Sequence, residues 1–193
     1  AVWSIVWSGC SLTAPRPEVH HYTLALPQPA PALGSGKSTL VVRAFSAHDP
    51  YNQERLVYRT SPYQLDFYNY HRWASSPTEQ IADLTRRYLR AAPLFAKVYP
   101  STDGNADFTL NGKLLQLDEI DHEKTWEAVL TIDFWLTRAE QRTPVWFQTY
   151  TVARQAEKRN PAAIAEAMSH NLATVLAKLV ADLTPVVAAP TGP

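Results

Sequence analysis

The sequence predicts an α+β fold, in which two main helices pack on one face of a mostly antiparallel sheet. Short segments of alternating apolar and polar residues recur between residues 20 and 155, which is the pattern of half-buried strands. Two longer segments have helical spacing instead, one beginning at Pro77 and one at Pro161. The chain has 193 residues, which is enough for one domain with its own hydrophobic core.

Strand-like segments fill the first part of the chain. They cover residues 20–26, 38–47, 54–60 and 63–70. A loop is expected at 27–37, which is rich in Pro, Ala and Gly, and Ser61 and Pro62 predict a tight turn. The first helix then begins with Ser76 as its N-cap, Pro77 at its first position and Glu79 as the partner in a capping box.

The second half of the chain predicts four more strands and a long helix. The strands cover residues 94–100, 107–120, 123–136 and 144–155, of which the last three form an antiparallel set. The apolar face of the second of them changes along its length, which predicts a bulge near Gly112. Asn160 and Pro161 open the last helix, and the Pro- and Ala-rich residues 185–193 are expected to be a disordered tail.

Charge and cysteine content exclude two classes of function. Lys and Arg number 18, as do Asp and Glu, so the formal net charge is zero and a nucleic-acid partner is not expected. Cys10 is the single cysteine, so the chain can form neither an internal disulfide nor a zinc site built on cysteines.

The region around Cys10 predicts a lipid anchor. Residues 1–9 are uncharged and mostly apolar, as in the remnant of a signal peptide, and Ser8-Gly9-Cys10-Ser11 has the pattern of a bacterial lipobox, with Trp7 where Leu is usual. We expect lipidation of Cys10, a tether over 10–19 and a folded domain over 20–184. The alternative is a small buried cysteine.

The stretch GSGKST (34–39) resembles half of a phosphate-binding P-loop. A P-loop needs an earlier glycine, where this chain has Pro31, and it needs a helix after the lysine. The residues after Lys37 are β-branched and predict a strand. We therefore expect no nucleotide site here.

No other segment predicts catalysis, a cofactor or a metal. His20 and His21 are neighbours on a strand and point to opposite faces, so they cannot chelate one ion together. The acidic segment 118–124 is better explained as a solvated hairpin turn than as a metal site. No activated nucleophile stands out, so we expect a protein that is not an enzyme.

The densest group of aromatic residues lies at 51–77. Tyr and Trp there alternate with arginines, an enrichment found both in interface anchors and in cross-strand packing. Both explanations stay open at this point. The candidate interface residues are Arg55, Tyr58, Arg59, Ser61, Pro62, Tyr63, Tyr68 and Trp73.

One block within this segment, RLVYRTSPYQLDFYNYHRWA (55–74), resembles the ABC-type transport auxiliary lipoproteins, the PqiC-like proteins. The resemblance extends to the lipobox, to the strands HYTLAL and TLVVRAF, to ADFTLNGKLLQLD and to the Ala-rich last helix. It therefore covers nearly the whole chain.

The resemblance implies a non-enzymatic periplasmic lipoprotein that Cys10 anchors to the outer membrane, and Ser11 after the cysteine agrees with that location. It also implies MCE-domain and inner-membrane transporter subunits as partners, and a homo-oligomeric ring that docks the MCE tube. Two alternatives remain: an envelope scaffold or cofactor lipoprotein of a cell-wall enzyme and, with less support, a nucleotide hydrolase.

Overall fold

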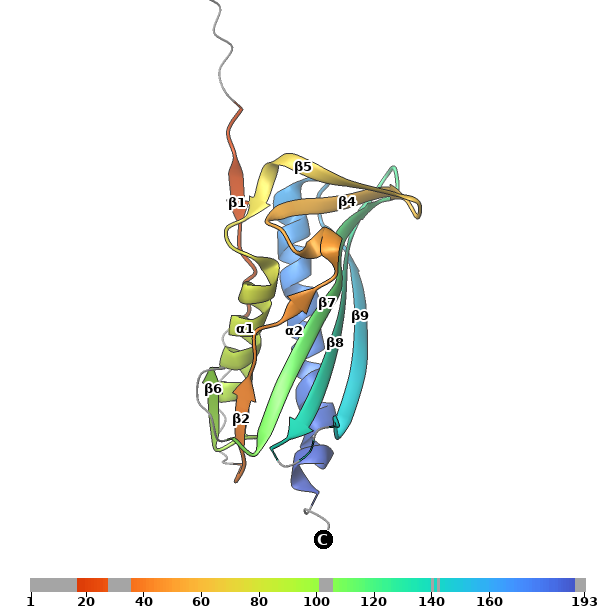
Figure 1. Ribbon diagram of the computed structural model, residues 1–193. Helices are drawn as coiled ribbons and strands as arrows, with labels where there is room; N and C mark the ends of the chain where they lie inside the picture. Colours follow the sequence, from red (N-terminus) through yellow and green to blue (C-terminus); the bar gives the residue numbers. More distant parts are fainter. Residues whose placement is uncertain (1–16, 28–35, 101–105, 140, 142, 190–193) are drawn as a thin grey trace, which may run out of the picture.

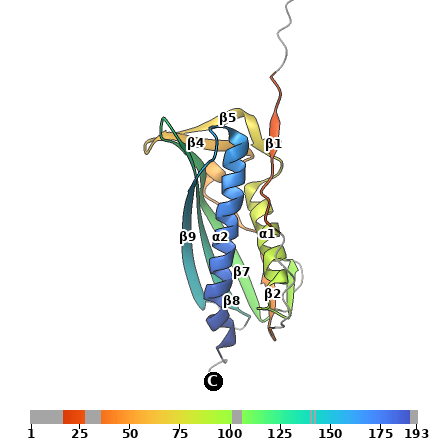
Figure 2. The same cartoon turned by 180° about the vertical axis from the view of Figure 1, so that it is seen from behind.

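The computed structural model describes residues 17–27, 36–100, 106–139, 141 and 143–189. One sheet and two helices form two layers, and both helices cover the same face of the sheet (Figures 1 and 2). The α+β class and the placement of the helices are as predicted.

The strands are, in chain order, β1 (His20–Tyr22), β2 (Thr39–Val42), β3 (Ser46–Ala47), β4 (Arg55–Ser61), β5 (Gln64–Trp73), β6 (Lys97–Pro100), β7 (Phe108–Asp121), β8 (Trp126–Arg138) and β9 (Trp146–Gln155). The long strand β7 is the centre of the sheet. Along one edge it pairs with β8, and β8 pairs with β9, all antiparallel. Along its other edge it pairs in succession with β2, β3 and β4, all parallel.

The expectation of a mostly antiparallel sheet needs correction, because the sheet is mixed. The antiparallel pairs are β4–β5, β7–β8 and β8–β9, whereas β1–β5, β2–β6, β2–β7, β3–β7 and β4–β7 are parallel. Alternation of apolar residues gives the exposed face of a strand but not its direction. The short strands of the first half reach β7 through crossovers that no local pattern encodes.

Several predicted boundaries also differ from the structure. The predicted strand 38–47 is broken into β2 and β3, and the first strand ends at Tyr22. The bulge in β7 lies at Leu115 instead of near Gly112, since the pairing with β8 shifts between Leu114 and Gln116.

The first helix, α1, spans Pro77–Ala91 and begins after Ser76, as predicted. The predicted capping box does not form, because the Ser76 side chain makes no capping hydrogen bond and instead lies 2.8 Å from the Thr78 hydroxyl. The side-chain amide of Gln80 donates to the carbonyl of Ser75 and accepts from the backbone N–H of Leu24. One glutamine thus joins the start of α1 to the segment after β1.

The second helix, α2, spans Pro161–Ala188, and the Asn160 side chain caps it by accepting from the backbone N–H of Ala163. By length and composition α2 could cross a membrane, but its apolar side packs on β8 and β9 as a core helix does. Residues 185–188, expected in a disordered tail, belong to this helix.

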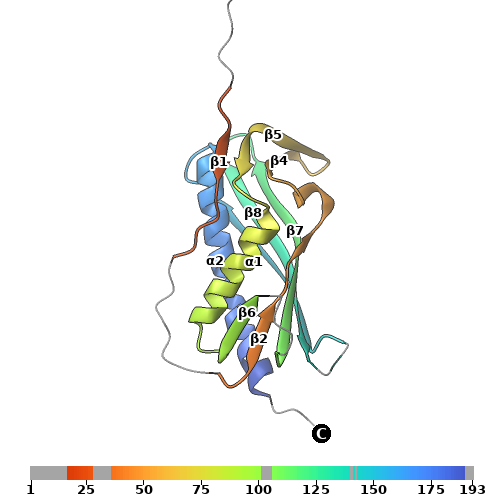
Figure 3. The same ribbon diagram turned by 60° about the vertical axis from the view of Figure 1, so that its left-hand side comes forward.

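The domain is elongated, and different strands and helix ends lie at its two ends. The hairpin end carries β1, the β4–β5 hairpin and the β7–β8 turn, and the N-terminal segment leaves the domain there (Figures 1 and 3). The distal end carries the last turn of α2 and the ends of β8 and β9 that face each other.

Candidate functional site: the β4–β5 hairpin

The candidate interface residues lie on one hairpin, but the structure distributes them between its surface and its interior. Tyr63 is at the tip and 98% exposed, and its backbone N–H donates to the Ser61 hydroxyl. Pro62 is exposed beside it. Trp73, at the other end of β5, is 2% exposed and belongs to the hydrophobic core, so it contributes no surface in this chain.

The remaining aromatic and basic candidates pack against one another. The rings of Tyr58 and Tyr68 lie 4.8 Å apart, and the guanidinium of Arg55 lies 4.5 Å above the Phe67 ring. All four residues are half-buried. Aromatic pairs and cation–π contacts of this kind stabilise a hairpin. This part of the block is therefore accounted for by packing.

Arg59 belongs to a buried polar network around Asp118. The side chain of Asp118 is fully buried, and its Oδ2 accepts from Arg59 Nε at 2.6 Å and from the Tyr51 hydroxyl at 2.8 Å. Its other oxygen accepts from the Gln116 amide at 2.8 Å. Burial is the main cause that raises the pKa of Tyr51 to about 12, so Tyr51 is a neutral donor. Arg59 therefore compensates a buried charge.

Glu119 is the second buried carboxylate of β7 and points to the opposite face from Asp118. Its oxygens accept from the Tyr68 hydroxyl at 3.1 and 3.0 Å. Burial raises the pKa of Glu119 to about 7, and the neighbouring charge of Asp121 adds to this effect. Burial likewise raises the pKa of Tyr68. Sequence analysis placed these two acids in a solvated turn and missed both networks.

Two histidines join β1 to the hairpin. The rings of His20 and His71 stack at 5.3 Å, and the Tyr22 hydroxyl lies 2.9 Å from His71 Nδ1. The pKa of His71 is lowered, first by burial and then by the nearby His20. His20 and His71 are partners in the parallel β1–β5 ladder, a contact between residues far apart in sequence.

A groove of about 470 Å³ separates the hairpin tip from the end of β7. It is lined by Arg59, Thr60, Ser61, Pro62, Gln116, Ile120, Asp121 and His122. Its basic group, Arg59, is already paired with Asp118, and His122 lies 3.3 Å from Glu127. Within the described part of the chain, no group of three or more His, Cys, Asp or Glu could hold a metal ion.

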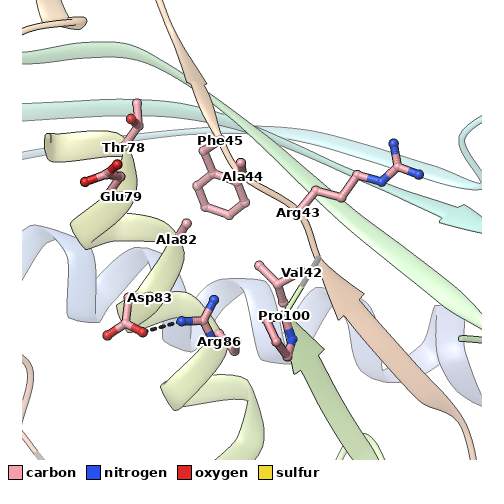
Figure 4. Close-up of a pocket in the computed structure, with 10 residues that line it drawn as sticks. All are labelled: Val42, Arg43, Ala44, Phe45, Thr78, Glu79, Ala82, Asp83, Arg86 and Pro100. Carbon is pink, nitrogen blue, oxygen red and sulfur yellow. Dashed lines mark hydrogen bonds and ion pairs between the residues drawn. The ribbon is translucent and has the colours of Figure 1, made fainter. Parts of the chain in front are cut away.

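A second hollow lies between α1 and the β2–β3 connection (Figure 4). Its volume is about 340 Å³, and Phe45 and Ala82 contribute apolar surface to it. Two of the charged residues at its edge, Asp83 and Arg86, are paired with each other. Figure 4 shows Arg43 pointing away from the hollow, so this site offers no free cation directed at a ligand.

The P-loop-like stretch has a structural role where it is described. The residues after Lys37 form β2, as predicted, and not the helix that a P-loop requires. A Cβ on Gly36 would lie 1.9 Å from the Leu94 carbonyl oxygen, so only glycine fits. Pro31 and Gly34 lie outside the described residues.

Of the acidic segment 118–124, predicted as a solvated hairpin turn, only the last residues form the turn, because residues 118–121 belong to β7. The backbone N–H of His122 donates to the Thr125 carbonyl, and Glu123 has a positive φ of 62°. Cys10, the predicted lipidation site, lies outside the described residues.

Sequence comparison identifies the family. The family model of the ABC-type transport auxiliary lipoprotein component matches residues 22–180. The chain belongs to this family. No curated protein matches the chain. Membership means that the protein is an auxiliary lipoprotein component of an ABC-type transport system.

Solved structures show the same fold for this auxiliary lipoprotein. Protein XCC0632 from Xanthomonas campestris is 23% identical with a TM-score of 0.74, over 88% of this chain and 95% of that one. An uncharacterized protein is 18% identical with a TM-score of 0.71, over 86% and 99%. The hypothetical protein CT253 from Chlamydia trachomatis is 7% identical with a TM-score of 0.55, over 80% and 100%.

Proposed function

We propose that this protein is the outer-membrane lipoprotein of an MCE-type system that moves lipids between the two membranes, and that it docks or receives the periplasmic tube of the MCE-domain protein. The observation that carries the proposal is the family match over residues 22–180. The lipobox around Cys10 supports membrane anchoring, and the serine at position 11 supports the outer membrane.

The role we propose is non-enzymatic. Two polar side chains of the hairpin are engaged with buried acids of β7: Arg59 with Asp118, and Tyr68 with Glu119. Networks of this kind hold a surface in shape. Any ATPase of the system is a separate subunit, because the P-loop-like stretch leads into a strand. A homo-oligomeric ring remains part of the proposal.

The deciding experiment is co-purification of the full, membrane-extracted chain with an MCE-domain protein from the same cell. Recovery of that protein in a stoichiometric complex supports the proposal. Recovery of peptidoglycan synthases in its place would favour the alternative, an envelope scaffold or cofactor of a cell-wall enzyme.

The anchor is tested separately with Cys10→Ser. The native chain is expected to incorporate labelled palmitate and to fractionate with the outer membrane, and the variant to do neither. If the variant is still labelled, Cys10 is not the lipidation site. The hairpin, with Tyr63 at its tip, is one candidate for the surface that contacts the partner.

A further inference from the structure

The distal end of the domain carries an exposed aromatic surface that the sequence analysis did not single out. Trp135 on β8 and Phe147 on β9 are direct cross-strand partners. Phe147 is 56% exposed and Trp135 is half-buried. Trp146, the neighbour of Phe147, points to the opposite, helix-covered face, where its ring lies 6.5 Å from that of Tyr150. We refer to Trp135 and Phe147 as the distal aromatic surface.

Two segments of this end carry no charged side chain, namely residues 143–153 and residues 183–189. On β8, Asp133 lies on the same face as Trp135, and its carboxylate accepts from the Thr149 hydroxyl. Arg138 lies close by, but its guanidinium packs over the Phe108 ring at 5.1 Å and donates to the carbonyl of Ala189. Exposed aromatic residues whose charged neighbours are already engaged are typical of the centre of a protein–protein contact.

The distance of this surface from the lipid anchor indicates which partner it can meet. Pro17 is seven positions after Cys10, so the two residues lie at most about 25 Å apart. The helix α2, with 28 residues, runs from the hairpin end to the distal end (Figure 1) and is about 42 Å long. A lipid on Cys10 therefore holds the hairpin end near the membrane and cannot reach the distal end.

The exposed large hydrophobic residues follow the same division. In the described ranges they are Val19, Tyr63, Tyr70 and Phe147. The first three belong to the N-terminal segment and the hairpin, and Phe147 alone lies at the distal end. A partner that arrives from the inner membrane meets the distal end first.

We propose that the distal aromatic surface is the contact site for the MCE-domain protein, with Phe147 as its central anchor. This inference rests on the proposed function and adds the surface that performs it. The hairpin then faces the outer membrane, and Tyr63 lies outside the contact with the tube.

The test compares two exposed aromatic residues at opposite ends of the same chain. Phe147→Ser and Tyr63→Ser are made in the lipidated full chain, and binding to the purified MCE-domain protein is titrated. Both side chains are exposed, so neither change removes core packing. We expect Phe147→Ser to weaken binding about tenfold or more and Tyr63→Ser to leave it unchanged. Phe147→Leu should retain most of the affinity.

A photo-crosslinking amino acid at each of the two positions gives an independent measurement. A crosslink to the MCE-domain protein from position 147 and none from 63 supports the inference. Binding that survives Phe147→Ser, or a crosslink from 63 alone, overturns it while leaving the proposed function in place. Loss of self-association in Phe147→Ser with unchanged partner binding would assign the surface to a second copy of this chain and also overturns it. Absence of any complex with the native chain contradicts the proposed function itself.

Discussion

Tyr68 donates its hydroxyl to both carboxylate oxygens of Glu119, at 3.1 and 3.0 Å, and covers an acid that is 1% exposed. No cation in the described residues lies within ion-pair distance of this carboxylate. Burial favours the protonated form of this acid, and it outweighs the hydrogen bond from Tyr68, which favours the charged form. The protein should therefore respond to pH near neutrality.

The first prediction concerns Glu119 and stability. Its folded-state pKa is about 7, above the ordinary value of 4.5, so the folded protein binds a proton more tightly than the unfolded chain. This contribution is fully present below about pH 4.5 and is lost as the pH rises through 7. Glu119→Gln should raise the free energy of unfolding at pH 8 by up to about 3 kcal/mol.

Urea denaturation of both proteins between pH 5 and pH 8 checks this prediction. The difference between variant and native chain should grow with pH. A difference that is constant across the range would show that Glu119 does not titrate there. Glu127→Gln, a less buried acid on β8, is the matched control and should show little change.

The second prediction concerns Arg59 and Asp118. Arg59→Met leaves a fully buried carboxylate without its cation and should destabilise the fold by about 3 kcal/mol. The double variant Arg59→Met with Asp118→Asn removes the charge as well and should recover part of this loss. Thermal unfolding of the four proteins of this cycle measures the coupling. Equal stability of the single and the double variant would contradict it.

The third prediction concerns Gly36. Gly36→Ala forces a methyl group against the Leu94 carbonyl and should destabilise the fold by several kcal/mol.

Excess ATP with Mg²⁺ should leave the melting temperature of the native chain unchanged, since a ligand that binds the folded state must stabilise it. A rise in melting temperature with ATP would restore the nucleotide hypothesis. Lys37→Ala is the control for Gly36→Ala and should leave the melting temperature unchanged.

The fourth prediction concerns the attachment of β1. The pKa of His71 is lowered, so the unfolded chain binds protons more readily than the folded one. Below about pH 6.5 this pair loses stability as the pH falls, in the opposite sense to Glu119. The stacked His20, its partner in the β1–β5 ladder, adds to this lowering of the His71 pKa.

Hydrogen exchange separates this local effect from global unfolding. We expect the amides of β1 to lose protection between pH 7 and pH 5.5, while the amides of β8 keep theirs. His20→Gln should reduce the loss. Unchanged protection of β1 over this range would contradict the prediction.

Local patterns predicted the elements whose neighbours are close in sequence. The antiparallel strands β7, β8 and β9 were predicted from alternating apolar residues and short turns. The buried side of α2 was predicted from the helical spacing of its apolar residues. The parallel pairings could not be predicted in this way, because contacts such as His20 with His71 join segments about fifty residues apart. The bulge was expected but placed a few residues early, at Gly112, although the break in alternation lies at the adjacent Leu114 and Leu115.

The candidate interface was predicted from composition, which does not distinguish a ring in the core from a ring on the surface. Trp73 and Tyr63 belong to one aromatic block, yet one is buried and the other is at the tip. A signal for the buried networks was present in the adjacent acids Asp118 and Glu119, because two neighbouring residues of a strand point to opposite faces and one of them must face the core. Phe147 gave no such signal, because the sequence does not show which face of β9 the helices leave uncovered (Figure 2).

The two adjacent acids of β7 also constrain how the chain can fold. They point to opposite faces, and only Asp118 meets a cation, whereas Glu119 meets a phenol. A slip of β7 by one residue would exchange their environments and leave an acid on each face without its partner. Asp118 and Glu119 therefore select one register of β7, because a sheet shifted by one residue would bury a carboxylate away from its partner.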